Sequence, residues 1–290
     1  MLRARQGRRE RAAGATRAWT VAAALALSVS VLGAQGVAVD PAPHAHDAHD
    51  AARTRAEAAR ALPFFVGERL EFAVDVARFG RIGKATMWVD GPEEVHGIGA
   101  YVLHFDFGAR VGLVRAADRT ESWLDPVRLA SLRFRKRERH PLSRHDERVE
   151  LDPTTGRWSA ADGGAGESAS AAPLDELSFI FFLRTLPLGD DSAWTLARHF
   201  DARRNPTLVR IVGRETVTTD AGTFNAVVLE MRVRDPRRYR GTGTIRVALS
   251  DDHCRLPLRI ESEMPLIGRA TLTLTGQNHA MGHAAAIAAR

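Results

Sequence analysis

Three acidic residues lie in sequence surroundings that could support acid–base chemistry. Asp118 and Glu121 flank Arg119, and Glu215 lies in residues 213–217 (GRETV). Two carboxylates from different strands can serve as general acid and general base on a glycosidic bond. Ion pairs with the many arginines are the simpler expectation, because the sequence does not show that these groups converge. We therefore treat Asp118, Arg119, Glu121 and Glu215 as ligand-binding candidates and assign no catalytic residue.

Three histidines near the N-terminus could bind a metal ion. His44, His46 and His49 alternate with Asp47 and Asp50. Imidazole and carboxylate groups bind zinc, copper and nickel. A flexible linker is the alternative, because a mobile chain lacks the outer hydrogen bonds that orient metal ligands. The low-complexity composition favours the linker, and a metal site at these histidines stays a prediction; no cofactor is expected.

Residues 251–254 (DDHC) form the densest cluster of ligand-type side chains. Consecutive side chains of a strand point to opposite faces, so a metal here would need ligands from elsewhere. The cluster falls between strand patterns that end at Leu249 and restart at Arg255. The sequence therefore favours a turn in which aspartates accept hydrogen bonds from the backbone.

Residues 133–148 (RFRKRERHPLSRHDER) carry seven basic residues against Glu138, Asp146 and Glu147. One hypothesis is an anion-binding ribbon for lipid phosphate, lipopolysaccharide or a polyanionic glycan. The alternative is a hairpin with one solvated charged face, whose charges keep its edge from aggregating. Interleaved opposite charges favour the hairpin.

No common catalytic motif is present in the sequence. It lacks a phosphate-binding Walker A loop, the His-Glu-x-x-His metal motif, the Gly-x-Ser-x-Gly nucleophile motif and a Cys-x-x-Cys pair. Enzymatic activity is therefore neither assigned nor excluded, and the missing motifs favour a protein that is not an enzyme.

The N-terminus has the organisation of a secretory signal. Six arginines precede an uncharged apolar run at residues 18–32, and small residues follow at 34–38. We predict a signal peptide over residues 1–38 and export to the periplasm. Two alternatives are a twin-arginine signal, which the Arg8-Arg9 pair would allow, and an uncleaved membrane anchor. That segment holds six of the 41 basic residues and one of the 35 acidic residues, so the remainder is close to neutral. Nucleic acid is therefore not an expected partner.

Beyond the signal, we expect a flexible Ala/His/Asp-rich linker at 39–61, one β-rich domain at 62–276, and a disordered tail at 277–290. Residues 159–172 (SAADGGAGESASAA) are expected to form a disordered loop inside the domain. The single cysteine, Cys254, excludes an intramolecular disulfide, so an ordinary apolar core must stabilise the domain. No stable membrane span is expected in the mature chain.

The domain sequence predicts a mainly β fold. Apolar and polar residues alternate in each of the segments 70–76, 103–107, 132–134, 227–233, 245–249, 256–260 and 272–274. Such alternation is typical of antiparallel strands with one buried and one wet face. We expect a single large antiparallel sheet, strongly curled or barrel-like.

One segment breaks the alternation. Leu177, Phe181 and Arg184 follow helical spacing, and Asp175 lies where a helix dipole favours an anion. Apolar residues on several faces predict one buried helix near 174–186, placed against the apolar face of the sheet. Phe181 and Arg184 join the ligand-binding candidates.

Several segments in this order resemble the exported bacterial family catalogued as domain of unknown function 3108. They are residues 63–70 (PFFVGERL), 118–125 (DRTESWLD), 175–188 (DELSFIFFLRTLPL), 213–217 (GRETV) with 221–224 (AGTF), and 249–252 (LSDD) with 255–258 (RLPL). The resemblance covers about residues 62–276, with an insertion near 159–172. It implies export and a fold like the curled or barrel-like sheets of periplasmic lipid carriers. It implies no activity, substrate or catalytic residue.

These observations lead to three functional hypotheses. The first is a binding module in which sheet and helix enclose an apolar cleft for a lipid-like or amphipathic envelope molecule. The second is a structural or interaction protein of envelope assembly, and the third is a hydrolase acting on envelope glycan or lipid. The sequence does not determine the oligomeric state.

Overall fold

The structure is a computed structural model that describes residues 62–140, 144–152, 154–235, 241–264 and 268–279. The predicted signal peptide, the linker with His44, His46 and His49, and the tail from residue 280 lie outside the described residues. None of the described helices is long and apolar enough to cross a membrane.

One antiparallel sheet of 14 strands contains every named strand. The strands are β1 (Arg69–Val76), β2 (Gly80–Val95), β3 (Ile98–Val111), β4 (Val114–Asp125), β5 (Ala130–Arg139), β6 (Arg144–Asp152), β7 (Arg157–Ala160), β8 (Ala165–Glu167), β9 (Ala193–Leu196), β10 (Thr207–Thr219), β11 (Gly222–Asp235), β12 (Gly241–Ser250), β13 (Pro257–Met264) and β14 (Gly268–Gln277). Their order in the sheet is β8 to β1 and then β14 to β9. The first and last long strands, β1 and β14, therefore join two meanders at the centre.

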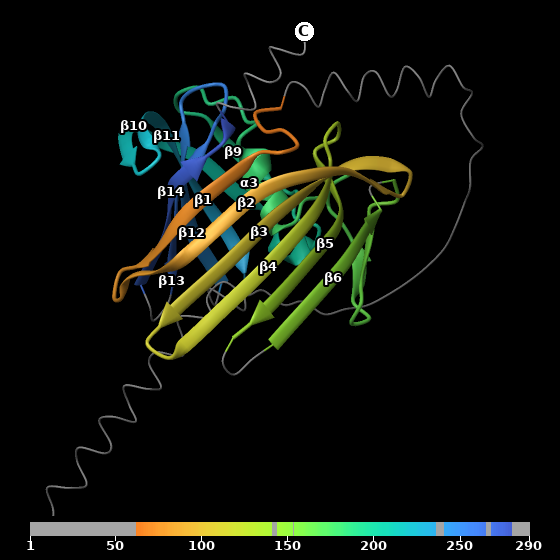
Figure 1. The fold of residues 1–290 in the computed structure, drawn as a ribbon. Coiled ribbons are helices and arrows are strands. Elements are labelled where there is room, and N and C mark those ends of the chain that lie inside the picture. The colour runs from red at the N-terminus through yellow and green to blue at the C-terminus, as the bar shows by residue number, and fades with distance from the viewer. Residues whose placement is uncertain (1–61, 141–143, 153, 236–240, 265–267, 280–290) are drawn as a thin grey trace, which may run out of the picture.

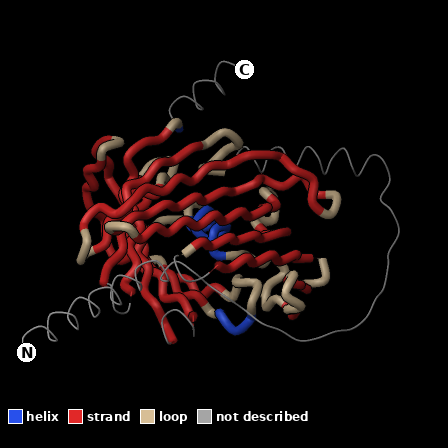
Figure 2. The backbone as a smooth tube through the Cα atoms, turned by 60° about the horizontal axis from the view of Figure 1, so that its bottom comes forward, coloured by secondary structure: helices blue, strands red, loops and turns tan. Residues whose placement is uncertain are grey.

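The sheet is open. Its end strands β8 and β9 do not pair with each other, so the expected strongly curled or barrel-like form is wrong in this respect. Closure would require a ladder between two strands of only three and four residues. The two halves instead face each other across a helix (Figures 1 and 2).

That helix is α3 (Glu176–Leu183), which confirms the predicted buried helix. Asp175 caps it: the carboxylate accepts hydrogen bonds from the backbone N–H groups of Leu177 and Ser178, and the Ser178 hydroxyl accepts one from the Asp175 N–H. Strands from both halves of the sheet contribute to one apolar cluster around α3. The helix thus fills the space between the halves.

Residues 159–172 are not the disordered loop that we expected. They include the end of β7 and all of β8, which pair as a hairpin. The Trp158 ring covers Gly166 so closely that an added Cβ would lie 2.9 Å from it. Phe200 packs edge-on against the same indole at 5.3 Å between ring centres. An aromatic contact from a distant segment therefore orders a stretch whose composition lacks any strand signal.

Candidate functional site

The β4 candidates lie on opposite faces of the sheet. Asp118 faces inward and lies 2.9 Å from His140 Nε2. Arg119 and Glu121 face outward, where the guanidinium and carboxylate are 3.2 Å apart. Glu215, on β10, instead pairs with Arg259 at 2.6 Å. The structure does not bring these carboxylates into one acid–base pair.

Phe181 lies in α3 and Arg184 caps the C-terminus of this helix, and both are inside the protein. Both Arg184 amino groups donate to the Glu68 carboxylate, at 2.6 and 2.8 Å. Nη2 also donates to the carbonyl oxygens of Pro63 and Cys254. Burial raises the pKa of Glu68, but the charge and hydrogen bonds of Arg184 outweigh it and hold that pKa below its ordinary value. This arginine attaches α3 to two chain segments and has no group directed at solvent.

The cluster at residues 251–254 is a turn, as the sequence favoured. Asp252 Oδ1 accepts hydrogen bonds from the backbone N–H groups of Cys254 (2.9 Å) and Arg255 (3.1 Å). Burial raises the pKa of the Cys254 thiol to about 11, which keeps it protonated at neutral pH. Within the described ranges, no group of three metal-binding side chains has suitable geometry.

The basic segment 133–148 forms the β5–β6 hairpin, with one charged outer face. Arg139 makes a bidentate pair with Asp146 (2.8 and 3.0 Å), and Arg133 contacts Glu150 at 2.6 Å. Lys136 is an exception, because its side chain points inward and is buried.

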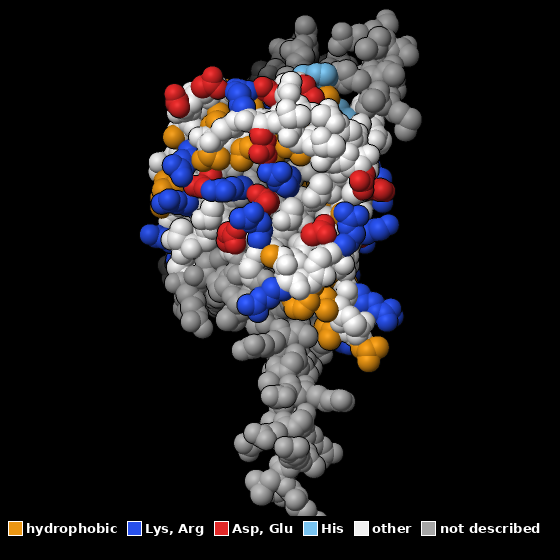
Figure 3. Space-filling view, turned by 90° about the vertical axis from the view of Figure 1, so that its left-hand side faces the viewer, with side chains coloured by type: hydrophobic (Ala, Val, Ile, Leu, Met, Phe, Trp, Pro, Cys, Tyr) orange, Lys and Arg blue, Asp and Glu red, His pale blue; other side chains and the backbone are white. Residues whose placement is uncertain are grey.

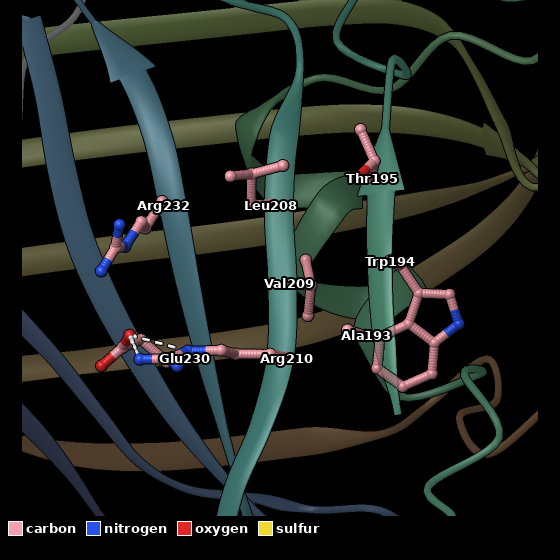
Figure 4. A pocket seen from close by; sticks show the side chains of 8 residues that line it. All are labelled: Ala193, Trp194, Thr195, Leu208, Val209, Arg210, Glu230 and Arg232. Carbon is pink, nitrogen blue, oxygen red and sulfur yellow. Dashed lines mark hydrogen bonds and ion pairs between the residues drawn. The ribbon is translucent and has the colours of Figure 1, made fainter. Parts of the chain in front are cut away.

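A pocket of about 320 Å³ lies at the β9 end of the sheet (Figure 4). Trp194 of β9 and Leu208 and Val209 of β10 form its apolar part. Leu208 remains 43% exposed, which is unusual for a leucine in a paired strand. Apolar surface of this kind, beside a few polar groups, is the usual composition of a ligand pocket.

A second pocket, of about 360 Å³, continues from the first over β10–β14. The two pockets share Arg210, Glu230 and Arg232. We call them together the outer groove; its charged end is completed by Thr244, Arg246, Glu261, Glu263 and Arg269. Figure 3 shows the side of the molecule that holds these strands, where basic and acidic side chains are interleaved with hydrophobic ones.

The shared residues differ in how far their charges are neutralised. Glu230 is buried and accepts hydrogen bonds from Arg210 (2.6 Å) and Arg246 (2.9 Å). These bonds hold the pKa of Glu230 below its ordinary value. Arg232 is exposed and makes no ion pair within the described part of the chain. The groove therefore offers one uncompensated guanidinium beside its apolar end.

A second group of charges is buried at the start of α3, and we call it the interior cluster. It consists of Lys136, Glu138, Glu147, Glu176 and Arg204. Glu176 accepts hydrogen bonds from Arg204 (2.7 Å) and Lys136 (3.2 Å), and Lys136 also lies 3.2 Å from Glu138. Burial raises the pKa of Glu176, but these two cations outweigh it and lower that pKa to about 2.

The pKa of Glu147 is shifted in the opposite direction to that of Glu176. Burial, followed by the negative charge of Glu176, raises its pKa to about 8 despite Lys136 and Arg204. Nearby His199 has a pKa lowered to about 3, first by burial and then by Arg204. At neutral pH this region thus holds a protonated carboxyl group and a neutral imidazole among fixed charges.

Sequence reasoning missed both groups, but one signal was available for the interior cluster. Leu132 and Phe134 lie on the apolar face of β5, and the same period of two places Lys136 and Glu138 on that face. Charged residues that continue an apolar face predict a buried polar network. Leu208 and Arg232 carry no such local signal, because they meet only across paired strands.

The fold and these sites define a protein with one open antiparallel sheet, a helix in its interior and no assembled catalytic centre in the described residues. A family model described as protein of unknown function (DUF3108) matches residues 71–275. The chain belongs to this family, as the sequence resemblance predicted. None of the curated proteins matches it.

Three solved structures match this chain at low sequence identity. A β-barrel-like protein of domain of unknown function DUF1849 from Brucella abortus is 12% identical with a TM-score of 0.51, over 73% of this chain and 96% of that one. A candidate lipoprotein from Parabacteroides distasonis and a candidate exported protein with a YmcC-like fold from Bacteroides fragilis are each also 12% identical, over 75% of this chain and 98% of theirs, with TM-scores of 0.29 and 0.32. The first similarity supports the barrel-like fold alone.

Proposed function

We propose that this protein is an exported binding module for an amphipathic envelope molecule, which it holds in the outer groove. The signal-like sequence of residues 1–38 supports export. The observation that best supports binding in the groove is that an apolar pocket and a charged pocket share the residues Arg210, Glu230 and Arg232. A molecule with an apolar chain and a polar head matches both ends.

The charges of the groove favour an acidic head group. Glu230 is neutralised by two arginines, whereas Arg232 has no carboxylate partner in the described residues. A phosphate or carboxylate bound to Arg232 would form a charge-assisted hydrogen bond, the stronger type of hydrogen bond in proteins. The apolar chain would then cover Leu208 beside the β9 edge of the sheet (Figure 4).

The interior is a poorer place for this ligand than we expected from the sequence. Phe181 and Phe182 of α3 and side chains of β2–β4 and β10–β12 pack in one apolar cluster. Arg184 already donates its hydrogen bonds to Glu68 and to backbone carbonyl groups. The proposed ligand site is therefore outside the sheet and not between the sheet and the helix.

A partner-binding role in envelope assembly is the second candidate, and the β9 edge favours it. This end strand, Ala193–Leu196, contains no charged residue. Uncharged end strands leave backbone groups available for pairing with another strand. The hydrolase hypothesis has less support, because Asp118 and Glu121 occupy opposite faces of β4.

Binding of single-chain lipids tests the proposal. Titration of the full chain with lysophosphatidylglycerol and the zwitterionic lysophosphatidylcholine, below their micellar concentrations, measures the preference for an acidic head. We expect the uncharged variant Leu208→Asn to weaken both by about tenfold, and Arg232→Gln to weaken only the anionic lipid by a similar factor.

Val127→Asn is the matched control, because Val127 is also exposed but lies in the β4–β5 turn, outside the groove. It should leave both affinities unchanged. Binding that is insensitive to both groove variants, or no binding of either lipid, would contradict the proposal and favour the partner-binding role.

A further inference from the structure

The hairpin turns of the first meander gather at one end of the sheet. Because β1 to β6 pair antiparallel in chain order, the β1–β2, β3–β4 and β5–β6 turns share that end (Figure 1). We call the described residues next to these turns the hairpin end. It lies on the other half of the sheet from the outer groove and shares no residue with it.

Two large apolar side chains project from the hairpin end. Leu113, in the β3–β4 turn, is 94% exposed, the highest value among the exposed large hydrophobic residues of the described chain. Phe79, in the β1–β2 turn, is 39% exposed. Leu113 gains little from packing within the protein, so its side chain is available for contact with an apolar phase or a partner.

Arginines surround both tips. Arg78 and Arg81 flank Phe79, and Arg110 and Arg115 flank Leu113. The last two are direct cross-strand neighbours in the β3–β4 register. Like charges placed directly opposite each other destabilise a hairpin. The fold therefore keeps this pair against a cost to its own stability.

The same arrangement recurs in the β5–β6 hairpin, where Arg139 lies opposite Arg144. Carboxylates compensate only part of this charge: Arg81 lies 3.7 Å from Asp75, and Arg139 pairs with Asp146. In the described residues, the other arginines of the hairpin end make no ion pair; they are Arg78, Arg110, Arg115 and Arg144.

Several arginines elsewhere on the outer surface have carboxylate partners. Arg210 and Arg246 share Glu230, Arg259 pairs with Glu215, and Arg269 pairs with Glu263. At the hairpin end the uncompensated cations surround protruding apolar side chains, whereas Arg135 and Arg148, which also make no ion pair in the described residues, do not flank an apolar tip. Cations around a protruding apolar tip are the combination with which peripheral proteins bind anionic lipid surfaces.

We propose that the hairpin end docks onto an anionic lipid bilayer, with Leu113 entering the head-group region and the surrounding arginines contacting lipid phosphates. A soluble polyanion is the less suitable partner, because it would leave Leu113 in water. The inference does not rest on the proposed groove ligand, since no residue belongs to both sites.

A fluorophore at the tip gives a readout that is local to the hairpin. Cys254 is the only cysteine, so a Cys254→Ser background with Leu113→Cys accepts one environment-sensitive nitrobenzoxadiazole label. The full chain is mixed with vesicles of phosphatidylcholine alone or with phosphatidylglycerol added. We expect emission to shift to shorter wavelength only with the anionic vesicles, and high salt to reverse the shift.

A label at Val212 serves as the positional control, because this β10 side chain is 41% exposed but lies away from the hairpin end. Its emission should not change.

The arginines are tested in the protein that carries the label at Leu113→Cys. There, Arg110→Gln with Arg115→Gln should weaken anionic vesicle binding by about 30-fold, because each cation contributes about 1 kcal/mol at an anionic surface.

Arg135→Gln with Arg148→Gln is the matched charge control. These residues are also a directly opposed, exposed arginine pair, but they lie further along the same hairpin from its turn. Residues 18–32 are identical in every variant, so their own affinity for lipid cancels in the comparison.

Two results would overturn the docking proposal. One is an equal loss of binding in the two arginine double variants, which would show that general surface charge is sufficient. The other is tight binding of soluble polyphosphate without any emission shift on anionic vesicles, which would assign the arginines to a soluble polyanion. Neither result depends on whether lysolipids bind the outer groove.

Discussion

The raised pKa of Glu147 predicts how the stability of this protein depends on pH. In the folded state, burial and the charge of Glu176 raise this pKa from its ordinary 4.5 to about 8. The folded protein therefore binds the proton more tightly than the unfolded chain between these two values. Unfolding then releases a proton, and the free energy of unfolding falls as the pH rises through this range.

Buried histidines oppose this trend only in acid. The pKa values of His104 and His199 are lowered, mainly by burial, from their ordinary 6.5. Each therefore makes the protein more stable as the pH rises toward 6.5, because the unfolded chain binds the extra proton. Above 6.5 the contribution of Glu147 remains. At about 1.4 kcal/mol per pH unit, the free energy of unfolding should fall by about 2 kcal/mol between pH 6.5 and pH 8.

Urea unfolding at these two pH values tests the argument. Wild-type protein should lose about 2 kcal/mol, whereas Glu147→Gln should lose much less, because its amide does not titrate. Glu150→Gln is the control on the same strand, since Glu150 pairs with Arg133 on the outer face. It should keep the wild-type decrease. A flat or rising wild-type profile, or an unchanged decrease in Glu147→Gln, would refute the assigned pKa.

Two further predictions concern packing. Arg184→Met should lower the free energy of unfolding by about 3–5 kcal/mol, because it leaves the Glu68 carboxylate buried without its guanidinium partner. Urea unfolding measures this loss. A loss no larger than that of Arg210→Met, at the surface, would contradict the prediction. Gly166→Ala should lower the melting temperature and release the Trp158 indole, since the new methyl group would meet the ring at 2.9 Å. Tryptophan fluorescence reports that release, and a Gly108→Ala control has no atom within 4 Å of the added carbon.

Local pattern was enough to predict the elements. Alternation at Leu70, Phe72 and Val74 predicted β1, and the structure buries all three side chains. The break in alternation after Asp175 predicted α3, and its cap and burial confirm it. These signals are reliable because strand and helix periods are set by neighbouring residues along the chain.

Sequence pattern could not predict the arrangement of the sheet. Whether β8 meets β9 depends on the lengths of two end strands that the sequence barely marks, and the structure leaves the sheet open. The ordering of β8 likewise depends on Trp158 and Phe200, which are distant from each other in sequence. Contacts between distant segments have no local period, so no pattern along the chain reports them.

The candidate sites divide in the same way. Sequence alone identified the residue types, including the arginine-rich β5–β6 hairpin and the buried arginine of α3. Only the tertiary structure decided which charges are neutralised: Arg184 by Glu68, Arg119 by Glu121, and Arg232 by no carboxylate in the described residues. The physical reason is that the effect of a charge depends on its partners and its burial, and strand pairing and packing across the sheet set both.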